Sequence, residues 1–247
     1  LFHPTLEREE IQLVGEVLGR GGEGEVIAGT VNGHPVAIKT AFVNSPLKLK
    51  MLIREVRRLS KARHHNIVML MGTCMNKEDG KLWILMERAT FGSLEQFLFP
   101  DCSLCEDEED RQDVRDGVSQ LCRDAFGDEN ALPGCSSVFL RIAHEVSSAV
   151  AYLHDYFGDK GGIAHNDIKP QNVLITQDGI SRLTDFGLSK SDASSLSSRS
   201  STNTHAIGTC AYMPPERLDN KPGVKVDDKK CDIYSLGMLF AAMLNGE

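Results

Sequence analysis

Apolar and polar residues alternate along the first part of the chain, and glycines interrupt the alternation. Over residues 11–39 this period of two predicts strands that are joined by tight turns. Residues 46–63 instead carry leucine and valine at the spacing of one helix face. Short apolar runs at 67–71 and 82–86 predict two more strands. We therefore expect a small, strand-rich lobe with one helix.

The second part of the chain is dominated by helical periodicity. Residues 138–153 predict a helix whose apolar stripe includes Leu140. Two short strands are expected at 173–175 and 182–184. From Asp232 onward the sequence is helical and almost wholly apolar, which is typical of a helix buried on all sides.

The charge of the chain is concentrated in one stretch. Between Asp101 and Asn130 there are eleven acidic and three basic residues, so this stretch holds the whole net charge of −8. Acidic sequence that is poor in aromatic residues is typical of a solvated segment. We expect residues 100–137 to be a disordered insert that offers a docking element for a basic partner surface. The rest of the chain shows no basic footprint for nucleic acid.

Seven cysteines with irregular spacing argue against a disulfide framework and favour a reducing, cytoplasmic location. No apolar run reaches the roughly 18 residues that predict a membrane span, and tethering by regions outside the chain is left open. The chain begins at Leu1 without a signal-peptide pattern and stops inside the apolar pattern Leu236–Leu244. We therefore expect it to be a segment of a longer protein.

Closely spaced glycines follow the first predicted strand, in the run Gly19-Arg20-Gly21-Gly22-Glu23-Gly24-Glu25-Val26. Glycines let backbone N–H groups approach phosphates without a side chain in the way. Alone, the pattern fits a flexible turn or a dinucleotide-binding loop equally well. A dinucleotide-binding loop requires a helix next, whereas the residues that follow predict a strand.

Lys39 ends an apolar run fifteen residues after Gly24. This spacing fits a hairpin that brings its ammonium group under the glycine loop, where it would hold phosphates. Taken alone, a lysine in this place is more often a solvated strand end. Glu55, in the middle of the predicted helix, is the candidate partner for Lys39. A surface salt bridge to the nearby arginines is the plainer alternative for Glu55.

Acidic and amide side chains are gathered in two short motifs. His165-Asn166-Asp167-Ile168-Lys169-Pro170-Gln171-Asn172 places Asp167 and Asn172 five residues apart, and Asp185-Phe186-Gly187 begins eighteen residues after Asp167. Oxygen-bearing side chains on loops at strand ends are what a magnesium–phosphate site requires. Asp167 would orient the acceptor hydroxyl, while Asn172 and Asp185 would bind the metal. Each acid alone could simply cap a turn, but the ordered set of motifs indicates one joint site.

With these motifs, the chain from about Gln12 to Leu244 resembles the protein kinase family. The resemblance makes residues 1–247 one kinase domain with a two-lobed α+β fold. It implies an antiparallel-sheet N-lobe with one helix over 12–88 and a mainly helical, truncated C-lobe over 89–247. It also implies that ATP and Mg²⁺ are the cofactors and that a protein is the substrate.

The resemblance further assigns an ATP site. Val26, Ala37 and Leu174 would sandwich the adenine, Met86 looks like the gatekeeper, and the hinge would follow it. The residues implied to bind ATP are Gly19, Gly21, Gly24, Val26, Ala37, Lys39, Met86, Glu87, Ala89 and Leu174.

Two residues resemble the pattern of serine/threonine kinases. Lys169, two residues after Asp167, matches the lysine that neutralises the transferring phosphoryl group, and Thr209 matches the threonine that bonds the catalytic aspartate. The implied activity is transfer of the γ-phosphate of Mg-ATP to serine or threonine. The stretch 66–94 is most similar to the tyrosine-kinase-like group of these enzymes. Asp232 resembles the helix aspartate that anchors the catalytic loop.

Asn166 departs from the pattern of many kinases, which have an arginine in its place. That arginine pairs with a phosphate on the activation loop, and the neutral Asn166 cannot. We therefore expect phosphorylation within the Ser/Thr-rich stretch 191–204 not to switch activity through Asn166. The alternative is that 191–204 is merely a flexible, soluble loop.

Two other functions stay open. A pseudokinase that acts as a nucleotide-binding scaffold or allosteric partner is disfavoured because Lys39, Asp167, Asn172 and Asp185 are all present. A kinase of small molecules is disfavoured by Thr209 and the long activation segment.

The acidic insert also has a metal-site alternative. Four thiols could bind zinc tetrahedrally, although no glycine or aromatic knuckle accompanies them. They belong to Cys102, Cys105, Cys122 and Cys135. A disordered decoration is the simpler interpretation.

Overall fold

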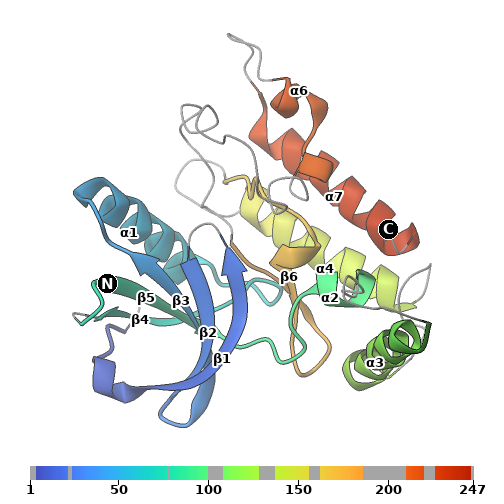
Figure 1. Ribbon diagram of the computed structural model, residues 1–247. Helices are drawn as coiled ribbons and strands as arrows, with labels where there is room; N and C mark the ends of the chain where they lie inside the picture. The colour runs from blue at the N-terminus through green and yellow to red at the C-terminus, as the bar shows by residue number, and fades with distance from the viewer. Residues whose placement is uncertain are drawn as a thin grey trace. The chain divides into compact units, whose positions relative to one another are not determined.

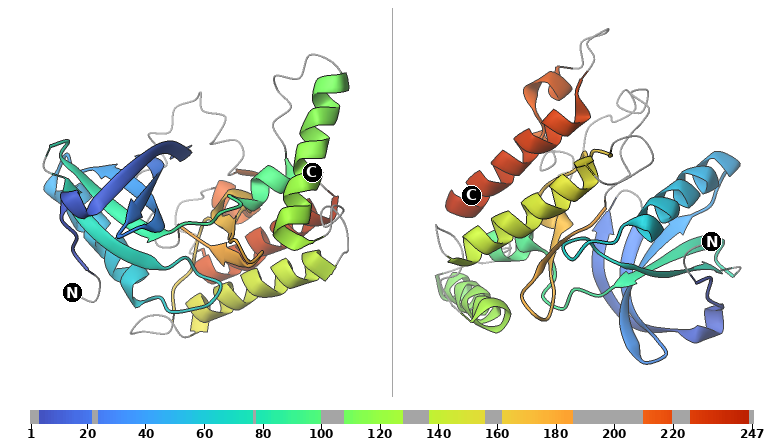
Figure 2. Two further views of the ribbon diagram at one scale, coloured as in Figure 1. Left: turned by 90° about the horizontal axis from the view of Figure 1, so that it is seen from below. Right: turned by 180° about the vertical axis from the view of Figure 1, so that it is seen from behind.

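The computed structural model of the chain forms two compact units, Leu1–Ala89 and Thr90–Glu247 (Figures 1 and 2). The backbone is described for residues 4–21, 24–76, 78–99, 108–127, 137–155, 162–185, 210–219 and 226–245. Within these ranges, the side chains of Arg20, Gly21, Glu55 and residues 108–115 are not described.

A five-stranded antiparallel sheet forms the N-terminal unit, with the strand order β1-β2-β3-β5-β4 (Figure 1). Its strands are β1 (Ile11–Gly21), β2 (Gly24–Val31), β3 (His34–Phe42), β4 (Leu70–Asn76) and β5 (Lys81–Glu87), and the short 3-10 helix η1 (Arg8–Glu10) precedes them. The strands expected from the period of two are confirmed. The fourth begins three residues later than predicted, because Ile67 and Val68 are buried without joining the ladder.

The two faces of this sheet carry different residues. Directly opposite residues in an antiparallel pair project to the same face, and successive residues alternate. Lys39 lies opposite both Val26 and Ile84, and Ala37 lies opposite Met86, so these side chains share one face. The other face carries an apolar cluster of Ile11, Val36, Ile38, Cys74, Trp83 and Leu85.

Helix α1 (Pro46–Lys61) has the start signals that its sequence predicts. The Ser45 Oγ accepts a hydrogen bond from the Lys48 N–H at 3.1 Å, and Pro46 occupies the first turn, where a missing N–H costs nothing. Leu52 and Val56 are buried, so the expected apolar face is confirmed.

The C-terminal unit is mainly helical. Its elements are α2 (Leu94–Leu98), α3 (Glu108–Phe126), α4 (Ser137–Asp155), η2 (Pro170–Asn172), β6 (Val173–Ile175), β7 (Ser181–Leu183), α6 (Pro215–Leu218) and α7 (Asp228–Asn245). Helices α4 and α7 lie side by side (Figures 1 and 2), with the rings of Phe139 and Phe240 6.3 Å apart. The two-lobed α+β fold expected from the sequence is confirmed.

Helix α4 is confirmed, but one residue of its predicted stripe is wrong. Leu140 is 58% exposed, whereas Phe139 and Ile142 are buried. The stripe therefore begins at the neighbouring position. Helix α7 is also not buried all round, because Ile233 is 58% exposed.

The expectation of a disordered insert is wrong for residues 108–126, which form helix α3. Cys122 and Ala125, three residues apart, are buried. The ring centroids of Phe126 and Phe97 on α2 lie 5.3 Å apart. The Arg141 guanidinium carbon lies 5.6 Å from the centroid of the Phe126 ring. The apolar stripe, and not the overall charge, thus decides the structure.

Within the described parts of the chain, no helix combines the length and the apolar character that crossing a membrane requires.

Candidate active site

Three glycines of the predicted phosphate-binding loop, Gly19, Gly21 and Gly24, lie near the tip of the β1–β2 hairpin. Gly21 pairs with Gly24, and Gly19 pairs with Val26. Gly24 has φ 148°, and a Cβ there would lie 2.0 Å from the carbonyl oxygen of Thr40. Only glycine fits at this position, for reasons of packing. A Cβ at Gly19 would meet nothing within 4 Å, so this position is open to an approaching ligand.

Lys39 is 7% exposed in the middle of the sheet, on the face that it shares with Val26, Ala37 and Met86. A buried ammonium group requires a charged or hydrogen-bonding partner. Glu55 lies in the third turn of α1, but its side chain is outside the described residues. Its ion pair with Lys39 therefore stays a prediction.

Reciprocal bonds fix the end of β5, where the hinge was expected. The Glu87 N–H donates to the Met69 carbonyl at 3.0 Å, and the Glu87 Oε1 accepts from the Met69 N–H at 2.6 Å. Met86 is buried at 7% exposure. The backbone from Glu87 to Ala89 therefore starts from a fixed position at the end of the sheet.

Asp232, fully buried on α7, organises the loop that carries the acidic motif. Its Oδ2 accepts from the His165 N–H at 2.6 Å, and its Oδ1 accepts from the Asn166 N–H at 2.7 Å. The His154 Nε2 lies 2.8 Å from Oδ2. One carboxylate thus holds two successive backbone amides of the loop, as expected from the sequence.

His165 is fully buried, and its bonds define its protonation state. Its Nε2 lies 2.9 Å from the Thr184 carbonyl oxygen, which can only accept, so Nε2 carries the proton. Its Nδ1 accepts from the Asp167 N–H at 3.2 Å. Burial lowers the pKa of His165, while the nearby Asp232 and Asp167 oppose this shift. A neutral imidazole therefore links the loop to the strand that precedes Asp185.

Asp167, Lys169 and Asn172 converge in the same loop. The Lys169 Nζ lies 2.9 Å from the Asp167 Oδ2. The Asn172 Nδ2 donates to the Asp167 carbonyl oxygen at 2.7 Å and to its Oδ2 at 3.0 Å. The Asp167 side chain keeps 38% exposure, so its carboxylate can reach a substrate.

Asp185 lies beside Asn172 because the Thr184 N–H donates to the Asn172 carbonyl at 3.0 Å. Its φ of 59° is a left-handed conformation that aspartate adopts more readily than most residues. The Asn172 amide nitrogen faces Asp167, which leaves its oxygen for a cation. An amide oxygen and a carboxylate suit a hard divalent ion, so these residues fit the expected metal site.

Leu174, expected to contact adenine, lies half-buried in β6. It forms a bridge with Ser93, and the Ile175 N–H next to it donates to the Gly92 carbonyl at 2.8 Å. These bonds hold β6 to the start of α2.

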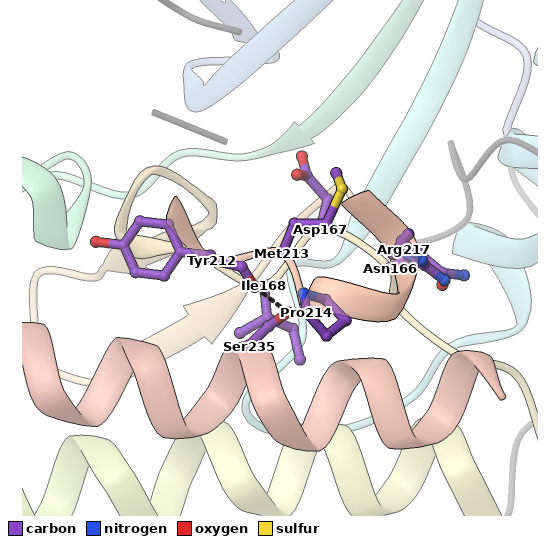
Figure 3. A pocket seen from close by; sticks show the side chains of 8 residues that line it. All are labelled: Asn166, Asp167, Ile168, Tyr212, Met213, Pro214, Arg217 and Ser235. Carbon is purple, nitrogen blue, oxygen red and sulfur yellow. Dashed lines mark hydrogen bonds between the residues drawn. The ribbon is translucent and has the colours of Figure 1, made fainter. Parts of the chain in front are cut away.

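A shallow pocket opens beside the catalytic loop (Figure 3). Its floor includes Ser235 of α7, whose hydroxyl donates to the Tyr212 carbonyl at 2.7 Å. Asp167 points away from α7, and Asn166 and Arg217 lie side by side at one end (Figure 3). The residues that line it are Asn166, Asp167, Ile168, Tyr212, Met213, Pro214, Arg217 and Ser235.

A family model described as the protein kinase domain matches residues 13–247 of this sequence. The chain belongs to the protein kinase family. The expected enzyme class, an ATP-dependent protein kinase, is therefore confirmed, and such domains use a divalent metal with ATP.

Relatives of this chain include receptor kinases from Arabidopsis thaliana. A G-type lectin S-receptor-like serine/threonine-protein kinase is 29% identical over 252 residues, or 99% of this chain and 26% of that protein. The L-type lectin-domain containing receptor kinase VII.1 is 28% identical over 232 residues, or 93% of this chain and 29% of that protein. The kinase domain thus spans less than a third of these relatives.

Several expected features of the kinase domain lie outside the described residues. These are Thr209, Phe186, Gly187, the Ser/Thr-rich stretch 191–204, and Cys102, Cys105 and Cys135 of the zinc alternative. Cys122, the fourth thiol of that alternative, is buried within α3.

Sequence reasoning missed two contacts of the catalytic loop. Arg217 bonds the side chain of Asn166, and Gln171 donates to Glu95 of α2. Neither contact had a sequence signal, because each joins residues more than 50 positions apart. Both nevertheless involve residues within the motif from His165 to Asn172.

Proposed function

We propose that this kinase domain transfers the γ-phosphate of Mg-ATP to serine or threonine hydroxyls of protein substrates. The geometry of the catalytic loop is the observation that carries the proposal. Asp167 is half-exposed beside Lys169 and Asn172, while Asp232 holds the loop backbone from the buried side. Positioned charges of this kind are what phosphoryl transfer requires.

Each residue of the loop has a proposed role. Asp167 orients the acceptor hydroxyl and takes its proton. Lys169, 2.9 Å from Asp167, supplies a positive charge beside the acceptor. Asn172 and Asp185 hold Mg²⁺, which when bound would neutralise phosphate charge.

The N-terminal unit would hold the nucleotide. Lys39 is proposed to bind the α- and β-phosphates and to pair with Glu55, and Gly19, Gly21 and Gly24 to cover the phosphates. The open space at Gly19 supports this role. The apolar residues on the Lys39 face of the sheet are proposed to contact adenine. The hinge at Glu87–Ala89 is proposed to contact it as well.

Serine and threonine are the proposed acceptors because Lys169 and Thr209 match the pattern of serine/threonine kinases. The G-type lectin S-receptor-like relative is named as a serine/threonine-protein kinase. We also propose that the domain belongs to the tyrosine-kinase-like group.

Regulation is proposed to be independent of a phosphate bound at Asn166. This predicts equal activity of the wild type before and after phosphatase treatment. The variant Asn166→Arg should instead gain a dependence on phosphate. A wild type that is inactive until one site in 191–204 is phosphorylated would contradict the proposal.

Location and partners are inferred from the cysteine content, the relatives and the acidic stretch. The cysteine content favours a reducing compartment, and the receptor kinases among the relatives favour tethering through regions outside this chain. Docking of a basic partner on the acidic residues 100–137 stays a prediction.

The test is Mg-ATP-dependent phosphorylation of the chain itself and of a generic protein substrate, beside the variant Asp167→Ala. Phosphoserine or phosphothreonine that forms only with the wild type would support the proposal. A folded wild type that binds ATP but transfers no phosphate would instead support the pseudokinase alternative. The intact set of Lys39, Asp167, Asn172 and Asp185 disfavours that outcome.

A further inference from the structure

Asn166, the residue before the proposed catalytic aspartate, has an unusual backbone conformation. Its φ is 69°, in the left-handed region that costs most non-glycine residues about 1 kcal/mol or more. Its N–H is held by Asp232 at 2.7 Å. Among the described residues, this is the only hydrogen bond of the Asn166 backbone, so the rest of the residue has to be fixed by its side chain.

Arg217 supplies the contact to that side chain. Its Nη2 donates to the Asn166 Oδ1 and also to the Asp228 Oδ1. Arg217 belongs to α6 and Asp228 is the first residue of α7, so one guanidinium group joins both helices to the catalytic loop. Figure 3 shows Arg217 beside Asn166.

The orientation of the Asn166 amide is defined by these contacts. Its oxygen faces Arg217, and its nitrogen points toward the Ala164 carbonyl at 3.5 Å. The Arg217 side chain is only 20% exposed, so water competes weakly for this bond. A hydrogen bond to a charged group is stronger than one between neutral groups.

The position of the bond makes it relevant to chemistry. Asn166 directly precedes Asp167, so a rotation of its backbone moves the Asp167 carboxylate. Asp232 restrains the buried side of Asn166, and Arg217 restrains the side that faces α6. Asn166 and Arg217 both line the pocket beside Asp167.

We propose that Arg217 is a positioning residue of this kinase domain, which holds Asn166 in its left-handed conformation and thereby places Asp167 for transfer. This latch consists of groups of the chain itself and requires no bound phosphate. The inference rests on the proposed function for its kinetic readout only. The competing explanation is that Arg217 only links α6 to α7 through its contact with Asp228 and does not position Asp167.

The kinetic test compares four single variants and one double variant. Arg217→Met removes the guanidinium group. Asn166→Gly removes the side-chain bond, and the glycine that it introduces tolerates the positive φ. Asn166→Asp keeps the accepting oxygen and serves as the conservative variant. Arg141→Met is the matched control, because Arg141 is an arginine of the same unit that donates to a backbone carbonyl, that of Gly179, at 3.1 Å.

We expect kcat to fall about tenfold in Arg217→Met and in Asn166→Gly, as for the loss of one charge-assisted hydrogen bond. The KM for ATP should stay within about twofold. The double variant should be no slower than either single one, because both remove the same bond. Asn166→Asp and Arg141→Met should keep a kcat near that of the wild type. A normal kcat in Arg217→Met with a lowered melting temperature would overturn the inference in favour of the competing explanation.

Hydrogen exchange separates this inference from the proposed function. If the wild type transfers no phosphate, the proposed function fails, but the latch can still be measured. The Asn166 amide should exchange about tenfold faster in Arg217→Met than in Arg141→Met. An unchanged exchange rate at this amide would overturn the inference whatever the activity.

Discussion

Replacement of Asp232 by asparagine is the sharpest test of how the catalytic loop is held. The substitution keeps shape and volume but exchanges one accepting oxygen for an NH₂ donor. Asp232 accepts from the backbone N–H groups of His165 and Asn166, at 2.6 and 2.7 Å. In either orientation of the new amide, one of these two donors would face another donor.

The magnitude follows from burial. Asp232 has no exposed surface, so water cannot replace the lost acceptor. Loss of a charge-assisted bond together with a buried, unpaired N–H costs about 3 kcal/mol. For a chain of this size, a change of that magnitude lowers the melting temperature by about 6 to 12 °C. We also expect kcat to fall about tenfold or more, because the loop that carries Asp167 loses an anchor.

Thermal melts and initial-rate kinetics would be measured for Asp232→Asn beside Asp178→Asn. Asp178 lies exposed in the turn between β6 and β7, so its replacement should change the free energy of unfolding by less than about 0.5 kcal/mol. If Asp232→Asn melted within about 2 °C of the wild type, the account of Asp232 as the buried anchor would be refuted.

Three further predictions concern other parts of the chain. Gly24→Ala should lower the free energy of unfolding by about 2 kcal/mol because its Cβ would overlap a carbonyl oxygen, whereas Gly19→Ala should leave the melting temperature near that of the wild type and raise the KM for ATP. Phe126→Ala should lower the free energy of unfolding by about 2 kcal/mol and expose α3 to proteolysis, and equal cleavage of both forms would contradict its packing role. Burial lowers the pKa of His165, so its imidazole binds a proton more readily in the unfolded state than in the folded state. Stability should therefore fall as pH drops below about 6.5, by up to about 1.4 kcal/mol per pH unit, and His165→Gln should flatten this dependence in melts from pH 8 to 5.5.

The catalytic loop could be predicted from sequence because its chemistry is contiguous. The positions of Asp167, Lys169 and Asn172 are fixed relative to one another within six residues, so a short motif defines their geometry. Asp185 joins them through a hairpin whose two strands were also predicted. The role of Asp232 came from the resemblance and not from any local signal.

Helix α3 could not be predicted by counting charge over a window. Its apolar stripe is short, and Cys122 and Ala125 of that stripe are buried. Leu140 shows the related error of phase, since a shift of one residue moves a side chain by about 100° around a helix. Both errors arise because burial depends on which neighbour covers a face.

The contact between Arg217 and Asn166 gives a physical reason for the departure at position 166. Arg217 already places a positive charge beside the residue that precedes Asp167, and Asp228 holds that charge in place. A second positive charge, at position 166, would repel the Arg217 guanidinium group. Asp232 would not neutralise it, because its carboxylate already accepts hydrogen bonds from backbone amides. A neutral acceptor that tolerates positive φ satisfies the guanidinium group and the backbone together. Asparagine meets both requirements. The absence of an arginine at this position is therefore consistent with a loop that Arg217 and Asp232 hold in place.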